Sequence, residues 1–210
     1  MLKFCARRVI SQIINYNFGF IMKKFISTFC GIAFTFSSIQ AEATSEGKLD
    51  PENIIVMELK DGTVEIELFP NKAPEHVKRI KELTREGFYN GVVFHRVIKN
   101  FMAQTGDPTG TGMGGSPKPD LKAEFNDIHH ARGIVSMARS MNPNSANSQF
   151  FIVLATASHL DKQYTAFGKV ISGMEFVDKI KKGSEDDNGQ VTNPDKIISM
   201  KILADIEKKK

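Results

Sequence analysis

The chain has 210 residues, which bounds it to one domain with additions or two small domains, and its 41% hydrophobic content is enough for a buried core. The formal net charge of +4 raises the question of a nucleic-acid or anionic-membrane partner. Residues 1–43, however, hold five of the 28 basic residues and one of the 24 acidic ones, which leaves 23 of each in the rest. The neutral body of the chain therefore excludes the charge signature of a nucleic-acid-binding protein.

The first segment has the three parts of a secretory signal. These are a basic pair, an apolar run and a cleavage motif with small residues: Lys23-Lys24, Phe25–Phe36 and Ala41-Glu42-Ala43. The apolar run is too short to span a bilayer comfortably as a helix of the mature protein. We therefore expect cleavage after Ala43 or Ala41, export to the periplasm or another extracytoplasmic space, and no stable membrane insertion afterwards.

Alternatives for this segment stay open. Met22 precedes the basic pair and looks like a natural start, which would make residues 1–21 an upstream extension. An uncleaved membrane anchor is the second possibility, and an amphipathic organelle presequence is a weaker third. The expected divisions are a presequence at 1–43, a linker at 44–52, a folded domain at 53–207 and a tail at 208–210.

Cysteine usage agrees with export without proving it. Cys5 and Cys30 both lie inside the presequence, so the expected mature chain has no cysteine. The folded domain then needs no disulfide and offers neither a thiol nucleophile nor a thiolate metal site.

The first half of the domain predicts four strands and one helix. Alternating apolar residues indicate strands at 53–60 and 63–69, and the Asp61-Gly62 pair between them favours a type I′ hairpin. A helix is expected at 73–86, with Pro74 in its first turn and Gly87 as its stop. Its inward stripe is Val77, Ile80 and Leu83. Two further strands are expected at 93–98 and 101–105, joined at Asn100.

The second half predicts four more strands and a second helix. Residues 107–120 are rich in glycine but lack the Lys-Ser/Thr and the helix of a phosphate loop, so we expect a long excursion that lines a groove. Strands are expected at 133–139, 149–154, 166–171 and 196–206. Ser172 and Glu175 form a capping-box pattern for the helix, which Gly183 would close.

Eight short strands and two well separated helices predict a mainly β fold: a closed eight-stranded antiparallel β-barrel capped by two α-helices. Phe150 and Phe151, adjacent in one strand, are expected to point to opposite faces. Only one of them can therefore lie in the core.

Two kinds of site are rejected at this stage. His129 and His130 have no further ligand at useful spacing, so we expect an exposed turn and no metal site. Ser136 and Ser148 lack a nucleophile-elbow motif and an evident histidine and acid partner, which argues against a serine hydrolase.

Arg96 is the first functional candidate. It lies in a strand otherwise built of valine, isoleucine and phenylalanine, where an unpaired arginine is costly to bury, so its side chain could face a concavity. An arginine at a sheet edge, held by a carboxylate such as Asp107, is an equally good interpretation of the spacing alone.

Four motifs in one order carry a resemblance: FHRVI, FMAQTGDPTGTGMGG, SANSQFFIVL and AFGKV. Together they resemble the cyclophilin family of peptidyl-prolyl cis-trans isomerases, and in particular its bacterial exported branch, over roughly residues 54–206. The resemblance implies the barrel fold and an enzyme that accelerates rotation about X-Pro peptide bonds in unfolded or partly folded polypeptides. It implies no cofactor and no metal.

The resemblance also implies roles for residues. Arg96 matches the catalytic arginine, Phe101 and Gln104 complete the catalytic set, and Gln104 supports the arginine and the substrate carbonyl. The substrate-binding positions include an apolar proline pocket made by Phe101 with Met102, Phe151 and Leu160. Beside the catalytic set, the implied substrate-binding residues are His95, Met102, Ala138, Arg139, Gln149, Phe151, Leu160 and Tyr164.

The chain departs from the best known family pattern at several positions. His159 stands where cyclosporin-sensitive relatives have tryptophan, so weak cyclosporin binding is expected. Tyr164, Thr105 and Arg139 replace the usual histidine, glycine and asparagine. Catalysis should survive these changes, whereas peptide preference should differ.

Two other classes of function are weighed against the enzyme. The first is a chaperone module that binds proline peptides without significant turnover, and the second is an inert scaffold. A pure binder has no need of an arginine directed at the prolyl nitrogen, which favours the enzyme. The neutral body has no heptad pattern, so we expect a monomer.

Overall fold

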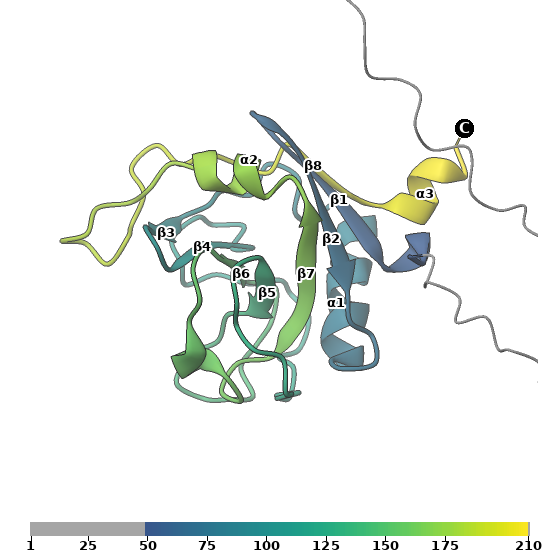
Figure 1. The fold of residues 1–210 in the computed structure, drawn as a ribbon, viewed down its shortest axis with the longest axis horizontal. Helices are drawn as coiled ribbons and strands as arrows, with labels where there is room; N and C mark the ends of the chain where they lie inside the picture. Colours follow the sequence, from purple (N-terminus) through teal and green to yellow (C-terminus); the bar gives the residue numbers. More distant parts are fainter. Residues whose placement is uncertain (1–48, 210) are drawn as a thin grey trace, which may run out of the picture. The chain divides into compact units, whose positions relative to one another are not determined.

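A computed structural model describes residues 49–209, and the expected secretory signal at 1–43 and most of the expected linker lie outside this range. The described part contains one antiparallel sheet of eight strands with the order β3-β4-β6-β5-β7-β2-β1-β8 (Figure 1). The strands are β1 (Ile54–Leu59), β2 (Gly62–Leu68), β3 (Arg96–Ile98), β4 (Met102–Thr105), β5 (Ile134–Met137), β6 (Phe150–Val153), β7 (Ala166–Ser172) and β8 (Ser199–Ile202).

The prediction of a closed barrel is wrong, because the sheet is open between β3 and β8. The outer edge of β3 is occupied by residues 183–191: Val97 donates to the carbonyl of Gly189 at 2.8 Å and accepts from Gly183 at 2.9 Å. Figure 1 shows the loop between α2 and β8 projecting beyond β3. Before the two edge strands, residues 91–94 and 195–197 are joined by three backbone hydrogen bonds, from Gly91 to Ile197, from Ile197 to Val92 and from Phe94 to Asp195.

The first hairpin follows the predicted alternation but not the predicted turn. Ile55, Met57, Val64 and Ile66 are at most 1% exposed and face the core. Leu59 pairs with Gly62, so the turn residues are Lys60 and Asp61 instead of Asp61-Gly62. Neither has a positive φ, as a type I′ turn requires, so that prediction is wrong.

Helix α1 (Pro74–Arg85) packs on the sheet with the predicted stripe. Val77, Ile80 and Leu83 are 3%, 0% and 0% exposed and join the main core with residues of β1, β2, β7 and β8. Because apolar side chains three and four residues apart share one helix face, this burial accounts for the helix position. No helix among residues 49–209 is long and apolar enough to cross a bilayer.

The second helix is shorter than expected and starts differently. Helix α2 (Met174–Lys179) is preceded by Gly173, whose φ is 81°, and no side chain caps it. Ser172 is the last residue of β7, so the predicted capping box does not form. The chain becomes extended at Ile180, with ψ of 131°, which ends the helix well before Gly183.

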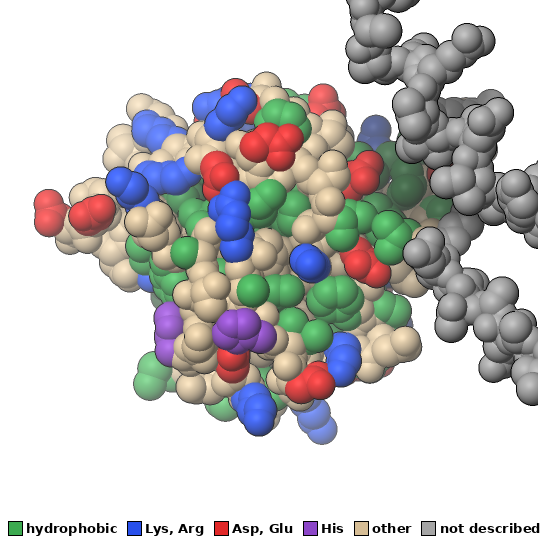
Figure 2. Space-filling model, viewed as in Figure 1, with side chains coloured by type: hydrophobic (Ala, Val, Ile, Leu, Met, Phe, Trp, Pro, Cys, Tyr) green, Lys and Arg blue, Asp and Glu red, His purple; other side chains and the backbone are tan. Residues whose placement is uncertain are grey.

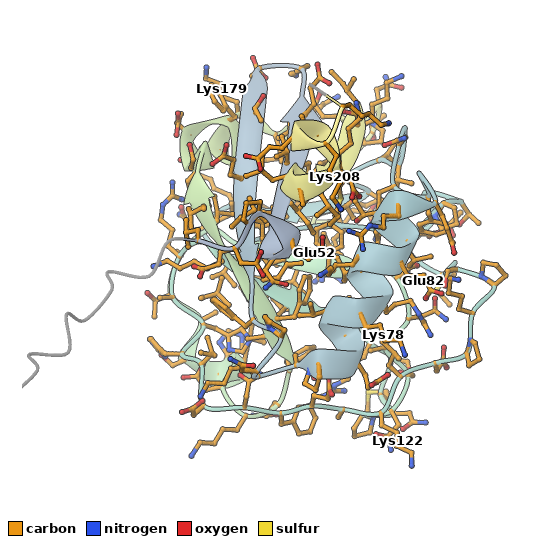
Figure 3. The ribbon with its side chains drawn as sticks, turned by 90° about the vertical axis from the view of Figure 1, so that its right-hand side faces the viewer. Glu52, Lys78, Glu82, Lys122, Lys179 and Lys208 are labelled. Atoms are coloured by element: carbon orange, nitrogen blue, oxygen red, sulfur yellow. The ribbon has the colours of Figure 1, made fainter. Side chains whose placement is uncertain are left out.

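The predicted last strand, 196–206, is also corrected. Strand β8 ends at Ile202, and a third helix, α3 (Leu203–Glu207), follows it. Arg85 of α1 donates to Asp205 of α3 at 2.9 Å and to Glu52 at 2.7 Å. Figure 3 shows Glu52, on the 3-10 turn η1 (Pro51–Asn53), beside α1 and α3. Arg85 thus joins η1, α1 and α3, at a place where alternation alone indicated a strand.

Two glycines with the same backbone conformation allow the effect of backbone strain to be separated from the effect of a steric clash. Gly173 has φ +81° and an added Cβ would lie 2.2 Å from the carbonyl oxygen of Thr63, whereas Gly91 has φ +82° and open space. We expect Gly91→Ala to lower the free energy of unfolding by about 1 kcal/mol through strain alone. Gly173→Ala should lower it by about 3 kcal/mol or more, because strand β2 must also shift. Chemical denaturation of both variants measures the difference, and equal losses would contradict it.

Candidate active site

A pocket of about 700 Å³ lies beside β3, β4 and β6, with the 3-10 turn η2 (Ser158–Leu160) and the glycine-rich loop on its rim. It gathers ten of the eleven residues proposed from the sequence. These are His95, Arg96, Phe101, Met102, Gln104, Ala138, Arg139, Phe151, Leu160 and Tyr164. The eleventh, Gln149, does not line the pocket but contacts Gln104 behind it.

Arg96 lies opposite Gln104 in the β3–β4 ladder, and three uncharged acceptors hold its guanidinium. Its Nη1 donates to Gln104 Oε1 at 3.2 Å, its Nε to the carbonyl oxygen of Asn188 at 2.9 Å, and its Nη2 to Asn188 Oδ1 at 2.8 Å. Burial lowers the pKa of Arg96 from its usual value. Asn188 is a contact that sequence reasoning missed, since it lies 92 residues away.

The alternative in which Asp107 holds Arg96 is wrong. Asp107 is fully buried, and its carboxylate accepts hydrogen bonds from Thr109, Gly112 and Gly114. Burial opposes ionisation of Asp107, but these hydrogen bonds prevail and lower its pKa to about 2. Asp107 therefore fixes the glycine-rich loop and does not neutralise Arg96.

Gln149 connects that loop to the arginine. Its Nε2 donates to the carbonyls of Gly112 and Gly114 at 3.0 and 2.7 Å, and its Oε1 accepts from Gln104 Nε2 at 2.9 Å. Gln104 in turn accepts from Arg96. The position of the guanidinium is thus linked to the backbone of the loop through two glutamines.

The apolar wall of the pocket is a second hydrophobic cluster, distinct from the main core. Met102, Phe151 and Leu160 are 2%, 5% and 5% exposed, and Phe101 packs against them. Phe150 belongs to the main core, so the predicted division between Phe150 and Phe151 is confirmed.

The rim combines aromatic rings with charge. The guanidinium of Arg139 lies 4.5 Å from the ring centroid of Tyr164, a cation–π distance, and Tyr164 packs edge-on against Phe151. His159 lies 5.4 Å from Phe101, centroid to centroid. On the side of Arg96, Figure 2 shows acidic side chains at the tip of the loop that projects beyond β3; this loop contains Glu185, Asp186 and Asp187.

His95 is a buried polar group without a partner among the described residues. It is 6% exposed, lines the pocket, and neither ring nitrogen has a hydrogen bond. Burial lowers its pKa, so the ring is neutral at pH 7. Because both ring nitrogens are shielded from solvent, a peptide in the pocket cannot reach them in this arrangement.

The prediction of an exposed turn at His129-His130 is half wrong. His129 is exposed, but His130 is fully buried and contacts Asp161 and Ser136 at 2.9 and 2.8 Å. Ser136 therefore has the histidine and acid partners that the sequence did not reveal. Its side chain is fully buried, however, so a substrate cannot reach the hydroxyl. No group of three candidate metal ligands occurs among residues 49–209.

Comparison with known proteins gives consistent results. Residues 54–202 match the family model described as cyclophilin type peptidyl-prolyl cis-trans isomerase. A probable peptidyl-prolyl cis-trans isomerase of Brucella suis biovar 1 is 55% identical over 190 residues, covering 85% of this chain and 96% of the relative. The mouse peptidyl-prolyl cis-trans isomerase-like 3 is 46% identical over 125 residues, covering 58% and 77%.

Solved structures agree with these relatives. Cyclophilin AquaCyp293 from Hirschia baltica has a TM-score of 0.67 at 28% identity, covering 75% of this chain and 76% of that one. A Cryptosporidium parvum isomerase, crystallised in the presence of the dipeptide Ala-Pro, has a TM-score of 0.65 at 30% identity, covering 71% and 98%. With a matching family model over most of its described residues, the chain belongs to the cyclophilin-type peptidyl-prolyl cis-trans isomerases.

Proposed function

We propose that Arg96 is the catalytic cation of this peptidyl-prolyl cis-trans isomerase, and that its substrates are proline-containing segments of exported polypeptides. The supporting observation is the position of Arg96 in a pocket with one apolar wall, where neutral acceptors alone hold its guanidinium. In this arrangement its charge is available to a bound peptide.

To accelerate rotation about an X-Pro bond, the enzyme needs only to bind the twisted amide more tightly than the planar forms. Rotation about an X-Pro bond is slow because amide resonance imposes a barrier of about 18–20 kcal/mol. As the bond twists, the prolyl nitrogen regains its lone pair. A guanidinium that donates to this nitrogen, or to the adjacent carbonyl, stabilises the twisted amide more than either planar form and so lowers the barrier.

The geometry leaves donors for this task. An arginine has five N–H donors, and three of those of Arg96 are engaged by the described residues around it. Two N–H groups remain for a substrate. Phe101, Met102, Phe151 and Leu160 form the adjoining apolar wall for the proline ring, and Gln104 is within reach of both Arg96 and a peptide carbonyl.

We expect Arg96→Ala to reduce kcat/KM by about 100-fold or more, since removing one preorganised donor to a transition state costs about 2.7–4 kcal/mol. The measurement is isomerisation of a short X-Pro peptide, with circular dichroism to verify the fold. Arg132→Ala is the matched control, because Arg132 pairs with Asp178 at the surface outside the pocket. Unchanged turnover in a folded Arg96→Ala protein would refute the assignment of Arg96.

The second candidate function is a chaperone module that binds proline peptides without turnover. The same apolar wall supports binding, so binding data alone do not separate the two functions. The isomerisation assay does: a wild-type protein that binds the peptide but leaves its exchange rate unchanged would support the chaperone. Arg96 held without a carboxylate favours the enzyme.

We expect the affinity for cyclosporin to depend on His159 at the rim of the pocket. His159 is exposed and packs beside Phe101, where the resemblance places a tryptophan in sensitive relatives. We expect weak binding by the wild type and at least about tenfold tighter binding by His159→Trp, because the larger ring buries more apolar surface. Inhibition of peptide isomerisation measures both affinities. A wild-type affinity equal to that of the variant would contradict this expectation.

The exported location makes a separate prediction. In a bacterial host that secretes the full chain, we expect a mature protein that begins near Glu42 or Thr44 and is a monomer in solution. Mass spectrometry of the mature protein identifies its first residue, and light scattering measures its mass. A mature chain that retains residues 25–36 would instead support the membrane anchor.

A further inference from the structure

Behind the apolar wall of the pocket lies a buried polar network centred on His130. The backbone N–H of His130 donates to Asp161 Oδ1 at 2.8 Å, and its Nδ1 lies 2.9 Å from the same oxygen. Its Nε2 lies 2.8 Å from Ser136 Oγ. Both ring nitrogens of this fully buried histidine are therefore satisfied, in contrast to those of His95.

The partners determine the proton positions. An ionised carboxylate only accepts, so Nδ1 of His130 carries the proton and Nε2 accepts from the hydroxyl of Ser136. The backbone N–H of His130 is the main cause that lowers the pKa of Asp161. Burial lowers the pKa of His130, which keeps the ring neutral and this hydrogen-bond order intact at pH 7.

His130 contacts two of the segments that form the apolar wall, β6 with Phe151 and the surroundings of η2 with Leu160. Its ring stacks on Phe151 with a centroid distance of 6.5 Å and an interplanar angle of 22°. Ser136 of β5 is the register partner of Phe151 in β6. The carbonyl of His130 accepts from Ala157 at 2.9 Å, and Ala157 in turn accepts from Leu160. One side chain and its backbone thus join β5, β6 and η2.

The turn η2 depends on these contacts. It has three residues, too few for a helical turn to be stable alone. His130 binds it on both sides, through Ala157 before the turn and Asp161 after it. Leu160, which η2 presents to the pocket, is held between these two anchors.

We propose that His130 is a positioning residue for the proline pocket, which holds Phe151 and Leu160 at the separation that fits a proline ring. This inference rests on the proposed function of the pocket. His130 does not contact the substrate; it acts through the two apolar side chains and through Asp161.

The chain offers a matched control in His76. This histidine is also fully buried and also bonded to a carboxylate, with Nδ1 2.6 Å from Glu124 Oε2. It lies on α1 and does not line the pocket. A buried histidine that serves only stability should behave as His76 does.

The experiment compares His130→Leu with His76→Leu in stability and in peptide isomerisation. Both variants should be less stable, because His130→Leu leaves the buried hydroxyl of Ser136 without its partner and His76→Leu removes the side-chain hydrogen bond to Glu124. His130→Leu should also lose about tenfold or more in kcat/KM, since a small displacement of the wall misplaces the proline. His76→Leu should stay within about twofold of the wild type. A folded His130→Leu protein as active as His76→Leu would overturn the proposal.

A second pair of variants keeps the test decisive if His130→Leu does not fold. Asp161→Asn retains the Oδ1 acceptor and should keep most of the activity, whereas Asp161→Ala should lose about tenfold. NMR of the Leu160 methyl groups should show shifts in Asp161→Ala but not in Asp161→Asn or His76→Leu. Equal activity and unshifted Leu160 signals in both Asp161 variants would overturn the proposal. An active Arg96→Ala protein would instead refute the proposed function, so the two failures are distinguishable.

Discussion

The arrangement of the site depends on a half-buried arginine that is held without a carboxylate. Removing a guanidinium from water is costly unless acceptors replace the lost hydration, and three neutral oxygens of Gln104 and Asn188 do so for Arg96. A carboxylate in their place would stabilise the cation more, but would also cancel its field at the pocket. Asp107, the carboxylate that the sequence offered as a partner, is instead occupied by the loop backbone.

The apolar half of the site follows from the period of a strand. Phe150 and Phe151 are consecutive, so one enters the main core and the other the pocket wall, and the two hydrophobic clusters lie on opposite faces of the sheet at β6. The wall has its own polar support in the network of His130, Ser136 and Asp161.

Local patterns predicted the parts of this structure that depend on neighbouring residues. The alternation in β1 and β2, the inward face of α1 and the division at Phe150 and Phe151 all follow from the period of each element. The errors lie where distant contacts prevail. Helix α3 forms where Arg85, 120 residues earlier, pairs with Asp205, and His130 is buried because Asp161 and Ser136 surround it. Neither contact leaves a signal in a short window of sequence.

The open edge of the sheet and the support of Arg96 have one cause. Residues 183–191 pair with the outer edge of β3, which keeps β8 from closing the barrel at that edge. The same pairing brings Asn188 to the guanidinium, with its carbonyl on Nε and its side chain on Nη2. If β3 and β8 were hydrogen-bonded to each other, β8 would lie along the edge of β3 that this loop now occupies. The departure from closure is therefore what allows two neutral oxygens to reach the arginine from outside the sheet.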